Sequence, residues 1–386
     1  MKRLLRVIKW LLISLFALVF GALAILYVMD PVLTTRLLTM DQGPEAVVRG
    51  GDPIVIPAIE NSHRTIDQAA LDAAIAYGAA TNSHALIVYH GNGIELEHYY
   101  PGSAATSITP TQSMHKSVLA MLIGIAIDQG HIASADTPAA DFLTEWANDA
   151  RSKITIRQML QQVSGIDFDS FSPDITSGFF QLMLGDDIRP TALNNDILFP
   201  PDTEFDYNSV NPQALGILIE RATGQPYADY LSAALWQHIG APDAAVILDS
   251  EEQRMARTFC CLQATARSWL HLGLLHLQNG KLGGKQVVPA EWIKQIQTPG
   301  SIQPNYGYLT WLGHEWSEQR YYNRKTSTSV LHSEPFVAPD VIYFDGMGGQ
   351  RVYIIPSAEM VIVRTGAIAM DWDDSILPNL LVRGIQ

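Results

Sequence analysis

The chain has 386 residues, of which 47% are hydrophobic and 17% are charged, and its formal net charge is −14 at pH 7. This length and composition can supply a large buried core, and they exclude an intrinsically disordered chain. The negative charge repels phosphate and argues against nucleic acid as a partner. With two cysteines, the adjacent Cys260 and Cys261, a disulfide-rich scaffold is excluded as well. Neighbouring cysteines can close only a strained ring, so we expect two buried small side chains rather than a redox pair.

The N-terminus differs in composition from the rest of the chain. Four basic residues within the first nine positions precede the uncharged, apolar residues 10–29. Twenty helical residues at about 1.5 Å each span roughly the 30 Å hydrocarbon core of a bilayer. The pattern predicts a transmembrane helix with its N-terminus in the cytoplasm. The alternative is a cleaved signal peptide, although residues 22–24 form a poor cleavage site and the apolar run continues beyond them.

We therefore divide the chain into three parts. Residues 1–30 are a basic cytoplasmic tail and transmembrane anchor, and residues 31–63, which are punctuated by Gly and Pro, are a stalk or linker. Residues 64–386 form the globular domain, and we expect this domain to lie outside the cytoplasmic membrane. Every acidic residue follows the apolar run, so the exported part is strongly acidic.

The predicted elements of the domain change from strands to helices and back to strands. Residues 67–80 have helical spacing with Asp67 as N-cap, and residues 85–89 and 94–100 read as a β-hairpin around a His-Gly-Asn-Gly turn. Helices follow at residues 117–129, 213–223 and 264–278, and β-branched runs at 341–344, 351–355 and 360–365. This order predicts a mixed α/β (α+β) fold, with an antiparallel sheet from both termini and a helical region inserted within it.

Ser113 and Lys116 form the S-x-x-K sequence of this chain, at the start of an apolar helix that must be buried. Residues three apart lie on one helix face, so an amine comes within reach of a serine hydroxyl near a helix N-terminus. A serine needs a base to become nucleophilic, and a lysine can be that base when burial lowers its pKa. The tetrapeptide alone is more often an ordinary solvated Ser and Lys on an amphipathic helix.

The wider pattern resembles the serine β-lactamase and penicillin-binding-protein-like superfamily. The resemblance is carried by the hairpin, by Ser-Met-His-Lys at residues 113–116, and by further stretches at residues 122–132, 154–165 and 214–224. It covers about residues 66–367. More narrowly, the chain is similar to class C β-lactamase-related serine hydrolases, which include esterases and 6-aminohexanoate-dimer hydrolase.

The resemblance implies a second motif, Tyr-x-Asn, which matches Tyr207-Asn208-Ser209 here. Tyr207 is then the proton relay near Lys116, as phenolate or as hydroxyl. A structural, half-buried tyrosine is the alternative. Ser209 stands where Asn is usual, which puts its role in orienting substrate in doubt.

The third motif of the family, Lys-Thr-Gly or His-x-Gly, aligns with residues 344–346. Phe344 replaces the cation that usually binds a substrate carboxylate, so we expect weak or no action on ordinary β-lactams. Gly346 and Gly348 would let the strand approach a substrate closely. The resemblance implies that the backbone N–H groups of Ser113 and Met347 form the oxyanion hole. The alternative is a glycine-rich turn without a ligand.

The resulting hypothesis is a serine hydrolase without metal or cofactor, anchored in the bacterial cytoplasmic membrane with its catalytic domain periplasmic or extracytoplasmic. Its partners would be a small or peptide-like amide or ester substrate and the membrane, and not nucleic acid. The chain has no H-E-x-x-H, C-x-x-C or G-x-S-x-G sequence. Two alternatives are a penicillin-binding-like sensor that acylates without turnover and a purely structural ectodomain. The sequence does not set an oligomeric state.

Overall fold

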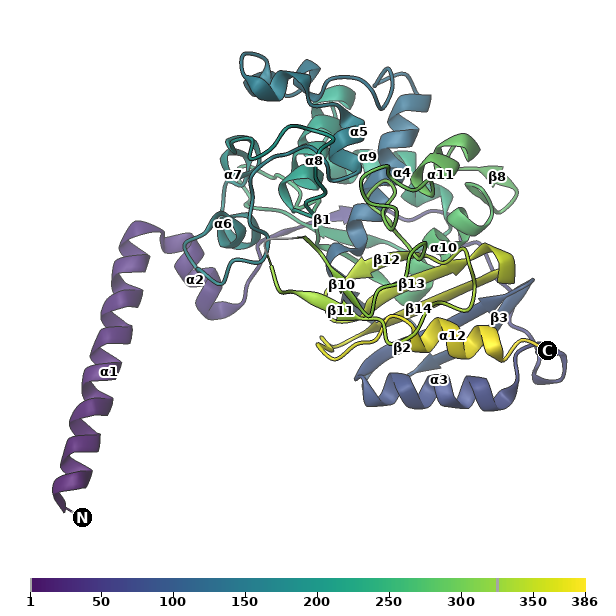
Figure 1. Ribbon diagram of the computed structural model, residues 1–386, viewed down its shortest axis with the longest axis horizontal. Helices are drawn as coiled ribbons and strands as arrows, with labels where there is room; N and C mark the ends of the chain where they lie inside the picture. The colour runs from purple at the N-terminus through teal and green to yellow at the C-terminus, as the bar shows by residue number, and fades with distance from the viewer. Residues whose placement is uncertain (1, 324–325) are drawn as a thin grey trace.

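The computed structural model describes residues 2–323 and 326–386. A long N-terminal helix projects from a body in which a sheet lies beside a helical region (Figure 1). The helices are α1 (Lys2–Met29), α2 (Pro31–Thr39), α3 (Gln68–Ala80), α4 (His115–Asp128), α5 (Ile156–Leu160), α6 (Gly178–Leu184), α7 (Arg189–Leu193), α8 (Val210–Thr223), α9 (Tyr227–Ala234), α10 (Ala266–Leu277), α11 (Ala290–Ile296) and α12 (Ile376–Arg383). The strands are β1 (Glu45–Val48), β2 (Ser83–His90), β3 (Gly93–Tyr99), β4 (Ile108–Pro110), β5 (Ala244–Ile247), β6 (Leu262–Thr265), β7 (Lys281–Leu282), β8 (Lys285–Gln286), β9 (Trp311–Leu312), β10 (Gln319–Tyr321), β11 (Ser329–Leu331), β12 (Ile342–Gly346), β13 (Gln350–Ile355) and β14 (Met360–Gly366).

The main sheet joins the two ends of the domain, as the sequence predicts. Its six strands run in the order β3-β2-β14-β13-β12-β9, and every neighbouring pair is antiparallel. The N-terminal hairpin β2–β3 therefore pairs directly with the last strand, β14. Helices α3 and α12 cover one face of this sheet, and α10 covers the other (Figure 1). The α+β architecture with an inserted helical region is confirmed.

Local sequence explains several of these boundaries. Helix α3 begins after Asp67, whose carboxylate accepts a hydrogen bond from the N–H of Ala69 and so satisfies a donor that the helix leaves free. The predicted hairpin turns at Gly91, which has a φ of +59° that glycine adopts without strain. All residues of β13 and β14 are buried, which agrees with the apolar runs 352–355 and 360–363 within them.

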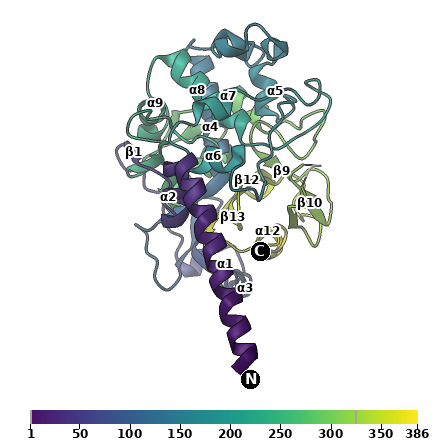
Figure 2. The same ribbon diagram turned by 90° about the vertical axis from the view of Figure 1, so that its left-hand side faces the viewer.

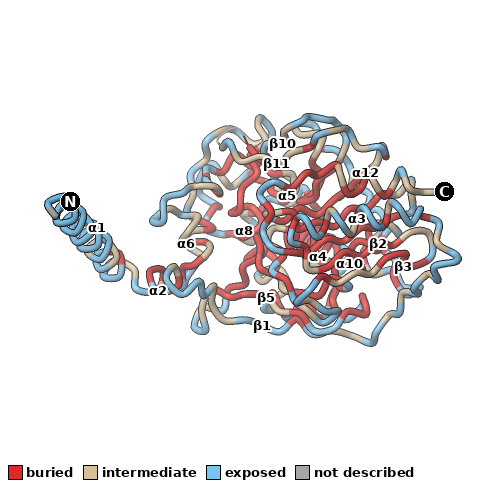
Figure 3. The backbone as a smooth tube through the Cα atoms, turned by 90° about the horizontal axis from the view of Figure 1, so that it is seen from below, coloured by how far each residue is buried: buried red, intermediate tan, exposed pale blue. Residues whose placement is uncertain are grey.

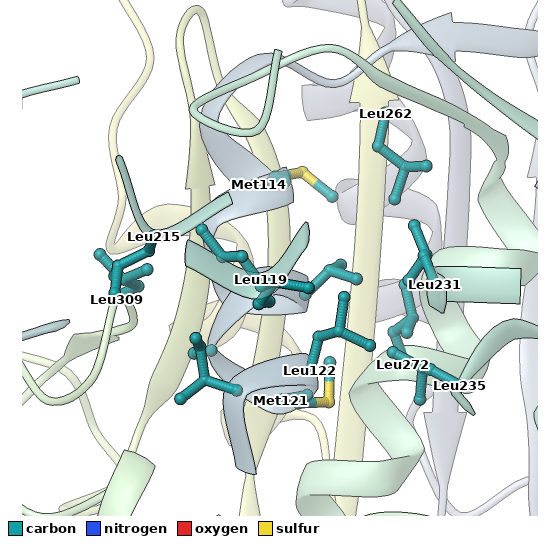
Figure 4. Packing of buried hydrophobic residues seen from close by; sticks show 14 of the residues in the cluster. Met114, Leu119, Met121, Leu122, Leu215, Leu231, Leu235, Leu262, Leu272 and Leu309 are labelled. Atoms are coloured by element: carbon teal, nitrogen blue, oxygen red, sulfur yellow. The ribbon is translucent and has the colours of Figure 1, made fainter. Parts of the chain in front are cut away.

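Helix α4 is the centre of the larger hydrophobic core. Its residues 115–126 are all buried, so it has no solvent-facing stripe. Figure 4 shows leucines from several elements packed around it, and Figure 3 shows buried chain concentrated in this region. The labelled core residues are Met114, Leu119, Met121, Leu122, Leu215, Leu231, Leu235, Leu262, Leu272 and Leu309. The first turn of α4 is thus held rigidly by packing on all sides.

Helix α1 stands apart from this core. Residues 3–29 are long and apolar enough to cross a membrane, and none of their most apolar window is buried. Residues 31–63, expected as a linker, contain α2 and β1, and both contact the domain: α2 packs on α6, and β1 pairs with β5. Gly and Pro in this segment mark turns between these short elements.

Cys260 and Cys261 are both buried, as predicted, but they are joined to each other by a disulfide. The expectation of two unlinked small side chains was wrong. Cys261 has a φ of +78°, in the left-handed region that most side chains avoid. An eight-membered ring that spans one peptide bond needs such an unusual backbone, which sequence patterns do not reveal.

Candidate active site

Ser113 lies in a short 3₁₀ turn (Gln112–Met114) that runs directly into α4. The preceding residue, Gln112, has a φ of +53°, a conformation of about 1–3 kcal/mol cost that is concentrated at functional sites. Lys116 follows one turn later, and its Nζ is 2.8 Å from Ser113 Oγ. The structure therefore brings the predicted nucleophile and base into direct hydrogen-bond contact.

Lys116 is buried, with 1% of its surface exposed. Burial lowers the pKa of its ammonium to about 7, and the nearby negative charge of Asp345 opposes part of this shift. Its second hydrogen-bond partner is the carbonyl oxygen of Phe259, at 2.7 Å. Near neutral pH a large fraction of Lys116 is a free amine, which can accept a proton from Ser113 across the same short distance.

Tyr207 lies over the same amine. Its ring centroid is 4.9 Å from Lys116 Nζ, and interaction with Ser113 acts to lower the pKa of its hydroxyl, against the larger effect of burial. Tyr306, Trp311 and Tyr322 enclose the ring, with centroids 5.2–6.1 Å away. Burial raises the pKa of Tyr207 well above its ordinary value, so this residue is a hydroxyl at neutral pH and can donate a proton. Tyr207 is 4% exposed, so it is buried rather than half-buried.

Ser113 opens into a cavity of about 350 Å³, which we call the Ser113 cavity. Its apolar walls come from distant segments of the chain: Phe171, Phe179, Met183, Phe259, Met370 and Trp372. Tyr207, Ser209, Met347 and Gly348, all predicted from motifs, also line it. The volume falls in the range of small-molecule sites.

Two predicted substrate contacts, Phe344 and Gly346, lie outside the Ser113 cavity. The ring of Phe344 is fully buried and packs on His276 of α10, 5.0 Å away. A side chain at Gly346 would collide with the carbonyl oxygen of Thr111, so this glycine permits close packing rather than substrate approach. Strand side chains alternate between faces, and Asp345, between these two residues, is the one that lines the cavity. We therefore leave Phe344 and Gly346 out of the substrate site.

Asp345 belongs to a buried ion cluster that includes Asp374, Arg320 and Arg351. Arg320 Nη2 lies 2.6 Å from Asp345 and 3.0 Å from Asp374, while Arg351 contacts the same carboxylates at 2.6 and 2.7 Å. Tyr322 adds a hydrogen bond to Asp345 at 3.0 Å. With two cations and two anions the cluster is formally neutral. Arg351, the cation that lines the cavity, is thus already paired.

Sequence reasoning did not identify Asp345 or the carbonyl of Phe259. Alternation along residues 342–346 could have placed Asp345 on the cavity side of the strand, opposite Phe344. The Phe259 carbonyl could not be found in this way because a backbone acceptor has no side-chain signature. His115 is fully buried and hydrogen-bonded to the carbonyl of Cys260 and to Tyr227 at 2.8 Å, so its ring packs in the core.

Comparison with known proteins agrees with this fold. A family model described as Beta-lactamase matches residues 71–365. The chain is 27% identical over 310 residues to a 6-aminohexanoate-dimer hydrolase from Paenarthrobacter ureafaciens, which covers 76% of this chain and 74% of that protein.

Solved structures share the fold. A candidate 6-aminohexanoate-dimer hydrolase from Bacillus anthracis superposes with a TM-score of 0.69 at 19% identity, covering 89% of this chain and 90% of that one. A D-stereospecific amidohydrolase from Streptomyces gives 0.58 at 17% identity, covering 81% and 97%. Because the family match spans most of the domain, the conclusion is direct: the chain belongs to the β-lactamase family and is a serine hydrolase.

Proposed function

We propose that the protein cleaves an amide or ester through an acyl-enzyme on Ser113, with Lys116 as the base and Tyr207 as the proton relay. The observation that carries this proposal is the 2.8 Å contact between Ser113 Oγ and a fully buried Lys116 whose pKa is lowered to about 7. A lysine that is solvated on a helix surface keeps its proton at neutral pH and cannot act as a base.

The proposed steps assign one role to each group. Lys116 takes the proton of Ser113, and Oγ bonds to the substrate carbonyl carbon. The backbone N–H groups of Ser113 and Met347 stabilise the oxyanion. Tyr207 donates its hydroxyl proton to the leaving oxygen or nitrogen as that bond breaks, and Lys116 returns a proton to Tyr207. Water then attacks the acyl-enzyme by the same route and releases the acid.

Membrane attachment is part of the proposal. None of the most apolar window of α1 is buried, and the charge pattern of the sequence favours a cytoplasmic N-terminus with the domain outside. Alkaline carbonate extraction tests this placement: an anchored chain stays in the membrane pellet, and a chain cleaved after a signal peptide appears in the supernatant.

The alternative is a sensor that is acylated once and does not turn over. The replacement of the usual cation by Phe344 and of Asn by Ser209 favours this view. The proton relay at Tyr207 favours turnover, because it supplies both the leaving group and the attacking water with a proton route.

The test is steady-state hydrolysis of a panel of neutral esters and amides. We expect repeated turnover by the wild type and its loss in Ser113→Ala. Ser329→Ala is a matched control, because Ser329 lines the same cavity but donates to Gln319 instead of contacting Lys116. A single equivalent of released product would support the sensor, and unchanged turnover in Ser113→Ala would disprove the proposal.

A further inference from the structure

The end of the N-terminal helix is fixed to one wall of the Ser113 cavity. Asp30, in extended backbone, separates α1 from α2, and its carboxylate accepts a hydrogen bond from Gln181 of α6 at 2.8 Å. Arg36 of α2 donates to the carbonyls of Leu184 and Gly185, at 3.0 and 2.8 Å, where α6 ends. Figures 1 and 2 show α2 and α6 side by side at the end of α1.

The opposite side of α6 faces the Ser113 cavity, into which it presents Phe179 and Met183. One helix, about 10–12 Å in diameter, therefore stands between α2 and the cavity. If α1 crosses a bilayer, its outer end at Asp30 lies at the membrane surface, and the cavity lies beside that surface. The separation between the cavity and the outer end of α1 does not depend on the tilt of α1, because the contacts to α6 are made by Asp30 and α2.

An exposed apolar edge borders the same cavity. Met347 and Met370 line it and are 46% and 75% exposed. Ile368, 54% exposed, packs against Gly348, which lines the same cavity. Large exposed apolar side chains that gather at one site mark contact with a membrane, ligand or partner. We call Met347, Ile368 and Met370 the apolar rim.

The cavity itself suits an uncharged ligand. Its charged lining residues, Asp345 and Arg351, are paired with each other and with Arg320 and Asp374. A substrate carboxylate or ammonium would lose its water without gaining a partner among them, at a cost of several kcal/mol. An apolar acyl chain would instead bury surface against the aromatic and methionine walls.

We propose that the substrate is an uncharged, membrane-partitioned acyl ester or amide, which enters the Ser113 cavity from the bilayer across the apolar rim. This inference rests on the proposed function and on the anchoring of α1. The docking of α2 on α6 keeps the cavity at the surface where such a substrate is concentrated, which raises its effective concentration.

The experiment uses the full chain in phosphatidylcholine vesicles, because the exposed Asp186 and Asp187 beside α6 would be repelled by anionic lipid. Two probes are compared: p-nitrophenyl acetate, which is soluble, and p-nitrophenyl palmitate, which partitions into the bilayer. The palmitate is placed in the enzyme's own vesicles or in separate vesicles. We expect hydrolysis in the same vesicles to be at least about tenfold faster, since the tether raises the local concentration.

Two variants separate bilayer access from catalysis. A 20-residue Gly-Ser insertion between Met29 and Asp30 keeps the anchor but lets the domain move away from the surface, with a linker span of roughly 25 Å. We expect it to lower the palmitate-to-acetate rate ratio about fivefold. Ile368→Ser should lower the same ratio, and Ile302→Ser, which changes an exposed isoleucine outside the apolar rim, should not.

The experiment distinguishes failure of the bilayer route from failure of the proposed hydrolase function. Acetate turnover that depends on Ser113, with equal palmitate rates in both vesicle arrangements, would overturn the bilayer route and leave the proposed function in place. A palmitate-to-acetate rate ratio that neither the Gly-Ser insertion nor Ile368→Ser changes would also overturn the bilayer route and leave the proposed function in place. Failure to hydrolyse either ester would count against both proposals.

Discussion

Lys116 and Tyr207 share one buried site, and burial moves their proton affinities in opposite directions. Burial disfavours a charge, so it lowers the pKa of the lysine to about 7 and raises the pKa of the tyrosine well above its ordinary value. The amine can then accept a proton at neutral pH while the hydroxyl can donate one. In the proposed mechanism, two groups whose pKa values are pushed apart in this way divide the base and acid roles between them.

The first prediction is a rise of kcat/KM with pH. Lys116 must be neutral to accept the proton of Ser113, and it is neutral above its pKa. Activity should therefore be low at pH 5, half-maximal near pH 7 and level above about pH 8. The measurement is kcat/KM for a neutral ester from pH 5 to 9, and a profile that falls across neutral pH would contradict the role of base.

The second prediction concerns the leaving group. Tyr207→Phe removes the proton donor, so hydrolysis of alkyl esters and amides, whose leaving groups need a proton, should fall by about 10²–10⁴. A p-nitrophenyl ester, whose leaving group departs as the anion, should lose much less. Equal losses for both kinds of substrate would assign Tyr207 to positioning of the site instead.

At the scale of the element, the side chains of β12 alternate between the two faces of the sheet, and this alternation decides which of them line the site. Asp345 faces the Ser113 cavity, while Phe344 packs on α10 and Gly346 fits against Thr111. The strand thereby connects the segment before Ser113 to the buried ion cluster. Asp345 and Arg351 of that cluster line the cavity, and the cluster is neutral only with all four of its charges.

The third prediction is that Asp345→Asn destabilises the fold. It leaves two buried arginines with one carboxylate, which typically costs about 3–5 kcal/mol. Urea unfolding measures this cost, and Glu334→Gln is the matched control, since it breaks an exposed pair with Arg383 worth about 0–1 kcal/mol. Because Asp345 raises the pKa of Lys116, the folded variant should also have its pH midpoint below that of the wild type. Equal stability in the two variants would contradict a structural ion cluster.

The fourth prediction is poor turnover of β-lactams. The carboxylate of a β-lactam would need a cation in the cavity. Phe344 replaces the usual cation and packs on His276, and Arg351 is already paired with Asp345 and Asp374. We expect kcat/KM for a chromogenic cephalosporin to lie at least about 10²-fold below that for a neutral ester, the equivalent of about 2.8 kcal/mol. Comparable values would mean that the ion cluster opens to receive an anion.

For the whole molecule, sequence patterns were most informative where the structure is locally determined. The capped helix after Asp67, the hairpin and the three C-terminal strands follow from periodicity and turn residues, and they lie close to the predicted boundaries. The pairing of Ser113 with Lys116 follows from helical spacing. These features depend on residues near one another in the chain.

The remaining features depend on contacts between distant segments. The docking of α2 on α6 and the pairing of β1 with β5 are made by a segment that reads as a linker. The Phe259 carbonyl that holds Lys116 lies 143 residues away in the chain. The disulfide between Cys260 and Cys261 follows the same carbonyl. None of these contacts leaves a periodic or compositional trace in the sequence.

Covalent labelling with a fluorophosphonate probe tests the central claim most directly, because it reports which serine is activated and by which base. Intact-mass and peptide mass spectrometry would locate the adduct in the wild type, in Ser113→Ala and in Lys116→Ala. The account predicts one adduct, on Ser113, with labelling that is lost in Ser113→Ala and slowed by about 10²–10⁴ in Lys116→Ala. An adduct on another serine, or labelling of Ser113 that does not depend on Lys116, would contradict it.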